Sequence, residues 1–368
     1  MSPRNHSGLG VMNQHHDEDV SVPVFDLFSK SPETSSMKEY RSQIYYSVTP
    51  LSHDGPFEFR VTTSADEFLH TPFIRLGGAF QVVRQDGGHL TEKDDVSVVN
   101  LAPDSLWRSI AFEIDNVKIE DSSYHYGFKA YFEKMLSQSI GAKYTHLRND
   151  FFKVDKNGSM DVYSKEMSKD SGYLARAESI KQSKLVYFNC TLALDICGIS
   201  SPLPPNTTYT LKLTRNEDQF TLLSSSKDYK ILIPELYLEV LKIIPSTSLL
   251  GQIEKRFSST PLKYELTRSK IQKYSIPSGV FDASQHALFD RGELPRFIMI
   301  ALTPQAAVSG SSTLNPFNFQ HYQLSEVCLT KNNIPVRYSF RENENNNTDV
   351  INIFFMLDSF HTIQTCVV

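Results

Sequence analysis

The sequence predicts a mainly β protein built around a jelly-roll sandwich. Short segments with β character recur along the chain, separated by Gly, Pro, Asn, Asp and Ser. The 368 residues include 24 Phe and 17 Tyr but a single Trp, and Phe and Tyr suit the half-buried surface of a sheet. About eight such segments fall between residues 44 and 243, which is the strand number of a jelly roll. An immunoglobulin-type sandwich would need only about 100 residues.

The first four predicted strands are bounded by turn signals. The sequence SHDGP between the first two strands indicates a tight connection. Gly77-Gly78 in the middle of the third strand predicts a bulge or bend. The fourth alternates apolar and polar residues up to the turn dipeptide Asp115-Asn116, which predicts a hairpin. These segments are 44–49, 57–62, 73–84 and 107–119.

The pattern changes period after the fourth segment. Apolar residues recur at intervals of three and four within 126–147, which predicts one amphipathic helix of about four to five turns. Set between strands, this helix would be an excursion that caps the sandwich. Its apolar stripe consists of Phe128, Tyr131, Phe132, Met135, Leu136 and Ile140.

Four further strands complete the first block. Pro202, Pro204 and Pro205 punctuate the loop between the first two of them. The strands are 185–197, 209–215, 219–223 and 230–243. We therefore expect a first jelly roll over 23–243, preceded by a polar, disordered arm over 1–22.

A second block follows the first. It begins with a short helix over 246–258, and the segment 262–276 is one long strand or a strand pair. The other strands are 296–303, 322–330 and 334–340. Four or five strands are too few for a complete sandwich, so we expect a partial second jelly roll over 244–341. The residues 342–368 begin with the polar run ENENNNTD and predict a divergent C-terminal tail.

The last hairpin repeats the pattern of the earlier one at an offset of about 217 residues, which predicts an internal duplication. The matched pairs are Trp107 with Leu324, Ile110 with Val327, Phe112 with Leu329, Asn116 with Asn333, and Val117 with Ile334.

Composition argues against several classes of protein. The net charge is −5 and no run of four Lys or Arg occurs, so we do not expect direct nucleic-acid binding. The N-terminus lacks the apolar core of a secretory signal, and no window has the ~20 apolar residues of a membrane helix. We therefore expect a soluble, intracellular protein whose four cysteines are reduced core residues. These are Cys190, Cys197, Cys328 and Cys366.

Two segments contain possible metal ligands. The run His15-His16-Asp17-Glu18-Asp19 lies in the predicted arm, where a solvated polar tail is the simpler interpretation. Asp155 to Glu166 places oxygens at the positions of an EF-hand loop, but Met160 stands where that loop needs Gly. We interpret the second segment as an Asn-Gly turn at Asn157-Gly158.

Sequence motifs of catalysis are missing as well. The chain has no GxSxG, HExxH, P-loop or GxGxxG motif, and His286, His321 and His361 are isolated. We predict no catalytic, cofactor or metal site, and hence a protein that is not an enzyme.

Several phrases resemble one family of capsid proteins. The most specific are NLAPDSLWRSIAFEIDNVKI at 100–119 and YHYGFKAYFEKML at 124–136. The others are FDLF at 25–28, LSHDGPFEFRV at 51–61, residues 295–300, and NPFNFQHY at 315–322. They are similar to the hexon-like double-jelly-roll major capsid proteins of adintoviruses and adomaviruses, which are related to Maverick/Polinton elements and occur as integrated copies in animal genomes.

The resemblance implies a structural function. Its members have two jelly rolls side by side, and three copies form a pseudo-hexagonal capsomer that tiles an icosahedral shell with partners such as the penton protein. It implies a location in the virion capsid, or an intracellular one for an integrated relic. Family members continue beyond the NPFNFQHY hairpin with the rest of a second sandwich, so this chain is expected to have an incomplete one.

Other functions are compatible with a jelly roll. A carbohydrate-binding or other ligand-binding domain would have exposed aromatic residues clustered on one sheet face or in loops, whereas the strands here alternate as core strands do. A domesticated host protein could keep the shell fold as an interaction module. A cupin-type enzyme would need a His-rich metal pattern on consecutive strands, which the sequence lacks.

Overall fold

The computed structural model describes residues 36–51, 55–156, 160–166, 171–280, 297–322, 326–331, 334–339 and 351–365. The predicted arm over 1–22 lies outside these residues. All strand pairs formed by the described residues are antiparallel.

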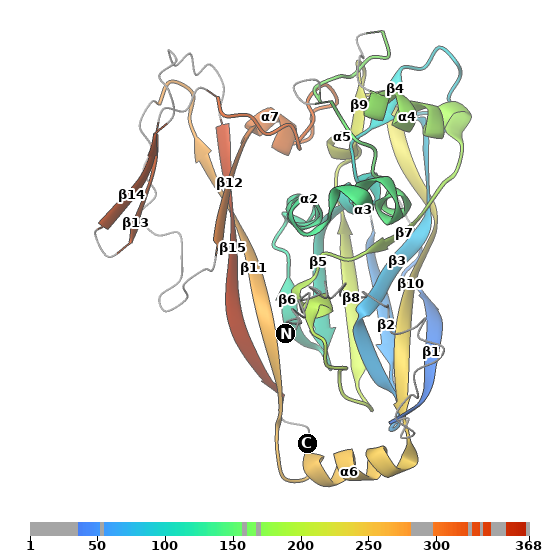
Figure 1. Ribbon diagram of the computed structural model, residues 1–368. Helices are drawn as coiled ribbons and strands as arrows, with labels where there is room; N and C mark the ends of the chain where they lie inside the picture. The colour runs from blue at the N-terminus through green and yellow to red at the C-terminus, as the bar shows by residue number, and fades with distance from the viewer. Residues whose placement is uncertain are drawn as a thin grey trace, which may run out of the picture. The chain divides into compact units, whose positions relative to one another are not determined.

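Eight strands of the first block form two four-stranded sheets (Figure 1). One sheet has the order β1-β10-β3-β7 and the other the order β2-β8-β5-β6. If the eight strands are numbered one to eight along the chain, the two sheets have the strand orders 1-8-3-6 and 2-7-4-5. These orders arise when one long antiparallel hairpin is wound into a sandwich. The predicted jelly roll is therefore confirmed. The strands are β1 (Met37–Tyr46), β2 (Pro56–Thr62), β3 (Phe68–Arg84), β5 (Trp107–Ile114), β6 (Val117–Asp121), β7 (Val186–Thr191), β8 (Thr208–Arg215) and β10 (Tyr229–Pro245).

The core lies between these two sheets. β2 alternates buried Phe57, Phe59 and Val61 with more exposed polar residues, as a strand with one buried face must. The Phe57 ring meets the fully buried Trp107 edge-on, with ring centroids 5.6 Å apart. Burial of each such side chain contributes about 1.5–3 kcal/mol, so the core is the main source of stability.

Short elements connect the strands of the first block. They are α1 (Ala102–Ser105), α4 (Ser171–Ile180), η3 (Lys181–Ser183), η4 (Asp195–Gly198), α5 (Asp218–Thr221), and the paired strands β4 (Val96–Val98) and β9 (Leu222–Ser224). The predicted strand 219–223 was wrong over its first half, where α5 forms. The predicted strand 185–197 ends six residues early, because the Glu120 carboxylate accepts hydrogen bonds from the amides of Asp195 and Ile196.

The bulge predicted at Gly77-Gly78 is absent, because β3 passes through both residues in regular register with β10. The pairing of the two strands is irregular at two other places. One lies on β10 between Leu232 and Glu235, where Pro234 cannot donate to the ladder, and the other lies on β3 between His70 and Arg75. The two glycines are instead required because β10 leaves no space for a side chain at either position. A Cβ at Gly77 would lie 2.3 Å from the Tyr237 ring, and one at Gly78 would lie 2.3 Å from the Glu235 carbonyl oxygen.

The single helix predicted over 126–147 is broken into three. They are α2 (Tyr126–Ser137), α3 (Ile140–Tyr144) and η2 (His146–Asp150). Gln138 has extended backbone angles and ends α2, and the Ser139 hydroxyl then accepts from the amide of Ala142 to cap α3. Phe128 and Phe132 are buried as predicted, but Leu136 in the last turn of α2 and Ile140 after the break are exposed.

In its described residues, the second block contains the helices α6 and α7 and five strands. The Ser246 hydroxyl caps α6 at its N-terminus, as the predicted helix requires. A three-stranded sheet has the order β11-β15-β12, and β13 pairs with β14 in a hairpin (Figure 1). The elements are α6 (Thr247–Phe257), β11 (Leu262–Ile276), β12 (Phe297–Pro304), α7 (Gln305–Val308), β13 (Glu326–Lys331), β14 (Ile334–Ser339) and β15 (Ile351–Thr365).

The second block repeats part of the topology of the first. The sheet β11-β15-β12 matches β1-β10-β3, because in both the last strand of the block lies between its first strand and a later one. The hairpin β13-β14 matches β5-β6, since two residues separate the strands in each. These matches support the predicted duplication. The segment 351–365, predicted to be part of a divergent tail, is instead the central strand β15, because its apolar run INIFFML supplies the partner that β11 and β12 share.

Candidate functional site

Helix α2 buries a lysine at the junction of the two blocks. The Lys129 Nζ atom lies 2.8 Å from Glu120 on β6 and 2.6 Å from Asp195 on η4. Burial lowers the pKa of Lys129, but the carboxylates of Glu120, Glu133 and Asp195 outweigh it and hold that pKa well above its usual range. The ammonium therefore stays charged and joins three elements of the first block.

The same cluster contacts the second block. The backbone amide of Ser269 on β11 donates to Asp195 at 3.1 Å. Nearby, the Tyr264 hydroxyl of β11 donates to the Pro202 carbonyl at 3.0 Å. Asp195 thus receives a donor from each block, so the Lys129 cluster is part of their junction.

A second buried lysine fixes the other side of α2. Lys134 lies 2.6 Å from Asp104 on α1 and 2.8 Å from Asp150 on η2. The Tyr126 hydroxyl also donates to Asp104, at 3.2 Å, and accepts from the amide of Ala193. Burial lowers the pKa of Lys134, but the attraction of Asp104 and Asp150 raises it well above its usual range. These bonds hold α2 in place at the end of the sandwich.

An aromatic cluster packs against another side of this helix. Tyr131 stacks on Phe317 with ring centroids 4.5 Å apart, and Phe128 meets the same ring edge-on at 5.7 Å. The Phe319 ring lies 5.0 Å from Phe132. The motifs YHYGFKAYFEKML and NPFNFQHY, which carry the family resemblance, therefore meet in one cluster. Its members are Phe128, Tyr131, Phe132, Phe220, Phe317 and Phe319.

Asparagines of the NPFNFQHY motif donate hydrogen bonds to the acidic segment that resembles an EF-hand loop. The Asp161 carboxylate accepts from the amide of Asn315 at 2.8 Å and from the Asn318 side chain. Asp155 pairs with buried Arg176 at 2.7 Å. Both carboxylates thus make protein contacts, and the described residues contain no group of three potential ligands that could hold a metal. The predicted turn at Asn157-Gly158 lies outside the described residues.

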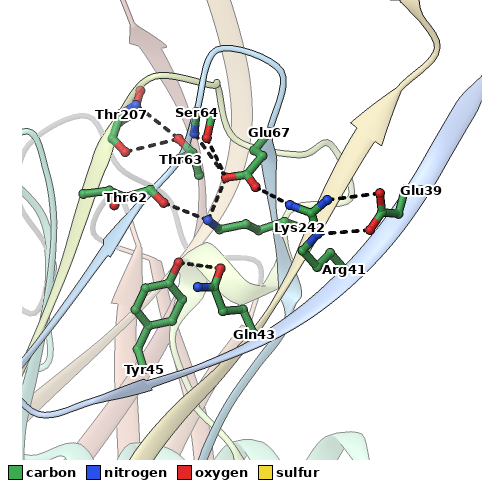
Figure 2. A network of polar contacts seen from close by, with 10 residues as sticks. All are labelled: Glu39, Arg41, Gln43, Tyr45, Thr62, Thr63, Ser64, Glu67, Thr207 and Lys242. Atoms are coloured by element: carbon green, nitrogen blue, oxygen red, sulfur yellow. Dashed lines mark hydrogen bonds and ion pairs between the residues drawn. The ribbon is translucent and has the colours of Figure 1, made fainter.

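Polar contacts also fix the edge strand β1 (Figure 2). Glu67 accepts from Lys242 on β10 at 2.7 Å, from Arg41 on β1 at 3.0 Å and from Ser64. Burial acts to raise the pKa of Glu67, but hydrogen bonds from Lys242 and Ser64 outweigh it and lower that pKa. Arg41 also pairs with the exposed Glu39. Glu67 therefore links β1 and β10 to the turn before β3.

The outer face of the sheet β1-β10-β3-β7 carries aromatic and aliphatic side chains. Tyr46 faces Tyr237 across the strands with ring centroids 6.4 Å apart. On the two edge strands, the exposed fractions are 60% for Tyr40, 50% for Ile44, 66% for Tyr46 and 68% for Tyr187. From their alternation, we expected the apolar residues of these strands to belong to the core. The exposed aromatic residues on this face correct that expectation.

The outer face of the opposite sheet is charged instead. Lys212 pairs with Glu113 at 2.8 Å, and Arg60 pairs with Glu58 at the same distance. Both basic side chains are largely exposed. The two faces of the sandwich therefore differ in chemistry, one ion-paired and polar, the other aromatic.

The remaining candidate residues lie partly inside and partly outside the described residues. His321 is exposed, whereas His286 and the run His15 to Asp19 lie outside the described residues. His361 belongs to β15. Cys190 is a buried free thiol as predicted and Cys197 is half-buried, but Cys328 is exposed, so it is not a core residue. Cys366 lies outside the described residues. The burial of Lys129 and Lys134 could not be predicted from the sequence, because the acidic residues that neutralise them most closely lie on other elements, 9 to 66 residues away along the chain.

Comparison with known proteins gives one distant relative and several similar structures. No protein-family model matches the chain. An uncharacterized protein of Caenorhabditis elegans is 23% identical over 285 residues, which cover 75% of this chain and 66% of that protein. The match thus spans slightly less than two thirds of the relative.

Three of the similar structures are capsid proteins. The Faustovirus major capsid protein has a TM-score of 0.49 at 6% identity and covers 92% of both chains. The PBCV-1 virus capsid has a TM-score of 0.49 at 11% identity, covering 90% of this chain and 87% of that one. The mavirus major capsid protein has a TM-score of 0.40 at 8% identity, covering 99% and 92%. In the described part of the chain, no helix combines the length and apolar character needed to cross a membrane.

Proposed function

We propose that this chain is a hexon-like capsid-shell protein, or the genome-integrated relic of one, and that it acts by self-assembly. The observation that carries the proposal is the repeated topology: a complete jelly roll is followed by a block whose sheet has the same strand order. Two such blocks in one chain are what the sequence resemblance to double-jelly-roll capsid proteins implies.

The geometry of the junction supports this function. A shell subunit needs blocks held rigidly, because each block must meet neighbours at fixed angles if the assembly is to close. Here a backbone hydrogen bond from Ser269 to the buried Asp195 carboxylate and stacked rings join the blocks, and the two motifs of the resemblance provide most of those rings.

The finer proposal follows the resemblance to adintovirus and Maverick/Polinton proteins. Three copies form a pseudo-hexagonal capsomer, further capsid proteins such as the penton protein are partners, and the site of action is the virion capsid. Neither a catalytic group nor a cofactor, membrane or direct nucleic-acid contact is needed for this function.

One observation favours a second candidate, a carbohydrate-binding or similar ligand-binding jelly roll. Such a domain would have exposed aromatics clustered on one sheet face. Tyr46 and Tyr237 lie together on the outer face of the sheet β1-β10-β3-β7, and Tyr40 and Tyr187 are exposed on its edge strands. Binding of the full chain to an array of glycans and insoluble polysaccharides tests it. A domesticated interaction module with the same fold would bind neither glycans nor its own copies.

The test of shell function is the assembly state of the purified full chain. Light scattering coupled to gel filtration should give a trimer of about 125 kDa, three times the 41.8 kDa of one chain. Electron microscopy at high protein concentration should then show capsomers or closed shells. A strictly monomeric chain at about 100 μM would overturn the proposal, since shell interfaces of standard size are stable well below that concentration.

A further inference from the structure

Three carboxylates surround one ammonium where the two blocks meet. The Lys129 Nζ atom lies 2.6 Å from Asp195 and 2.8 Å from Glu120. Glu133, one turn further along α2, lies 3.7 Å from the same atom. With all four groups ionised, three negative charges would face one positive charge in a largely buried place. Because uncompensated buried charge is costly, the cluster favours the uptake of a proton.

Glu133 is the group best placed to hold that proton. Glu120 also accepts from the amides of Asp195 and Ile196, so its charge is already stabilised. The exposed fraction is 26% for the Glu133 side chain, against 3% for Glu120 and 4% for Asp195, so solvent protons reach Glu133 most readily. Burial and the charges of Asp195 and Glu120 raise the pKa of Glu133, and together they outweigh the attraction of Lys129.

The same carboxyl groups hold a residue of the second block. The Ser269 amide on β11 donates to Asp195 at 3.1 Å, and the Ser269 side chain hydrogen-bonds Glu133. A hydroxyl can donate or accept, so the second contact is compatible with a protonated Glu133. Burial raises the pKa of Asp195 as well, so the two groups share one proton across the Ser269 contact. A change in the protonation of this pair therefore acts directly on the junction of the blocks.

We propose that this cluster is a proton-dependent latch between the two blocks, closed while Glu133 holds a proton and loosened when that proton leaves. The latch consists of Glu120, Lys129, Glu133, Asp195 and Ser269. A closed junction binds the proton more tightly than an open one, in which water solvates Glu133. Opening is therefore favoured as the pH rises from the ordinary carboxyl pKa of about 4.3 to the raised one, by at most about tenfold per pH unit for one proton. The latch acts within one chain and does not require the proposed self-assembly.

Other titratable groups at the junction behave differently. His125, just before α2, lies near Lys273 of β11 and Arg108 of β5. Its protonation adds a positive charge beside these two cations, which loosens the junction in acid. The Cys197 thiol of η4 lies close to the latch, and burial raises its pKa, so the thiol stays neutral. The latch and His125 thus act in opposite directions, and variants must separate them.

Thiol accessibility in the full chain tests the latch. β11 packs on η4, which carries Cys197, so opening should expose this thiol further. Cys190 lies in the core of the sandwich, 1% exposed, and should react only when the whole chain unfolds. A dithiodipyridine reagent modifies the native chain from pH 4 to 8, and mass spectrometry gives the rate at each cysteine relative to the unfolded chain at the same pH. Reaction of Cys190 in step with Cys197 would overturn the inference, because the proton would then act on the whole fold.

Glu133→Gln removes the titrating group and leaves His125 in place. The rate at Cys197 in the wild type, divided by the rate in Glu133→Gln, should rise with pH by up to about tenfold per unit and then level off. Glu178→Gln on α4 is the matched control, since its side chain is 69% exposed, and it should keep the wild-type profile. A ratio that is constant or falls with pH would contradict the latch. In His125→Gln, where the acid effect is removed, the Cys197 rate itself should rise with pH, and a constant rate there also overturns the inference.

Discussion

The Lys129 ammonium and the Asp195 carboxylate lie 2.6 Å apart although 66 residues separate them in the chain, and both side chains are 4% exposed. A buried ion pair contributes little over an apolar pair, but removal of one member leaves an uncompensated charge. Because Asp195 also accepts from Ser269 of β11, the cost of breaking the pair should reach the second block.

We therefore expect Lys129→Met to lower the free energy of unfolding by about 3–5 kcal/mol, since Glu120 and Asp195 would remain buried without their cation. Denaturant unfolding followed by circular dichroism measures this. Lys181→Met is the matched control: its pair with Glu178 is 3.8 Å long and partly exposed, so the change should stay within about 0.5 kcal/mol. An equal effect of the two variants would contradict the assigned role of Lys129.

Phe317→Ala should loosen the second block from the first. The ring packs against Phe128, Tyr131 and Phe220, and its truncation leaves a cavity that costs about 3–5 kcal/mol. Hydrogen exchange should become faster in β12, whose Met299 and Ala301 belong to the same cluster as Phe317, while β2 and β8 keep their protection. Uniform loss of protection throughout the chain would contradict a cluster that acts at the junction.

Gly77→Ala should be destabilising because the new Cβ would lie 2.3 Å from the Tyr237 ring. Overpacking of this kind costs about 1–3 kcal/mol, and Tyr237→Ala in the same chain should recover most of it by removing the ring. Gly251→Ala in α6 meets nothing within 4 Å and should instead raise stability by about 0.5–1 kcal/mol. Thermal unfolding of the three variants measures these changes in stability. If Gly77→Ala left the stability unchanged, the Tyr237 ring would be free to move away from the new Cβ.

His125 should make the protein less stable in mild acid. Burial and the charges of Lys273 and Arg108 lower the pKa of His125 to about 4. The unfolded chain binds the proton near pH 6.5, so stability is complete above that pH and falls towards pH 4, by at most about 1.4 kcal/mol per pH unit. Unfolding measured from pH 7 to 4 should show this slope. The slope of stability against pH should be smaller in His125→Gln. It should be unchanged in His146→Gln, because the His146 side chain is exposed.

Strand positions were largely predictable from the sequence, because a strand with one buried face must alternate. Phe57, Phe59 and Val61 show the principle. The count of eight agreed because two differences cancel: 107–119 contains both β5 and β6, whereas 219–223 adds no strand to the two four-stranded sheets. The pairing order did not follow from the sequence, since register depends on contacts between segments up to about 200 residues apart.

The candidate site was less predictable, for physical reasons that differ between residues. Lys129 has an ordinary place in a helical pattern, and only the fold brings Glu120 and Asp195 to it. Tyr46 alternates as a core residue would, and only the pairing of β1 with β10 shows that it faces outward. The NPFNFQHY motif was recognisable, but its stacking on α2 was not.

Glu67→Gln should release the edge strand β1. The amide cannot balance the buried Lys242 ammonium, so we expect a loss of about 2 kcal/mol at pH 7 and faster hydrogen exchange in β1. Because the folded-state pKa of Glu67 is lowered, its contribution is present above the unfolded pKa of about 4.3 and is lost as the pH falls through the folded value. The wild type and the variant should therefore converge in stability below pH 4. Glu39→Gln, which removes only an exposed partner of Arg41, should change stability by less than about 0.5 kcal/mol. If Glu39→Gln also released β1, the strand would be held by its surface pair and not by Glu67.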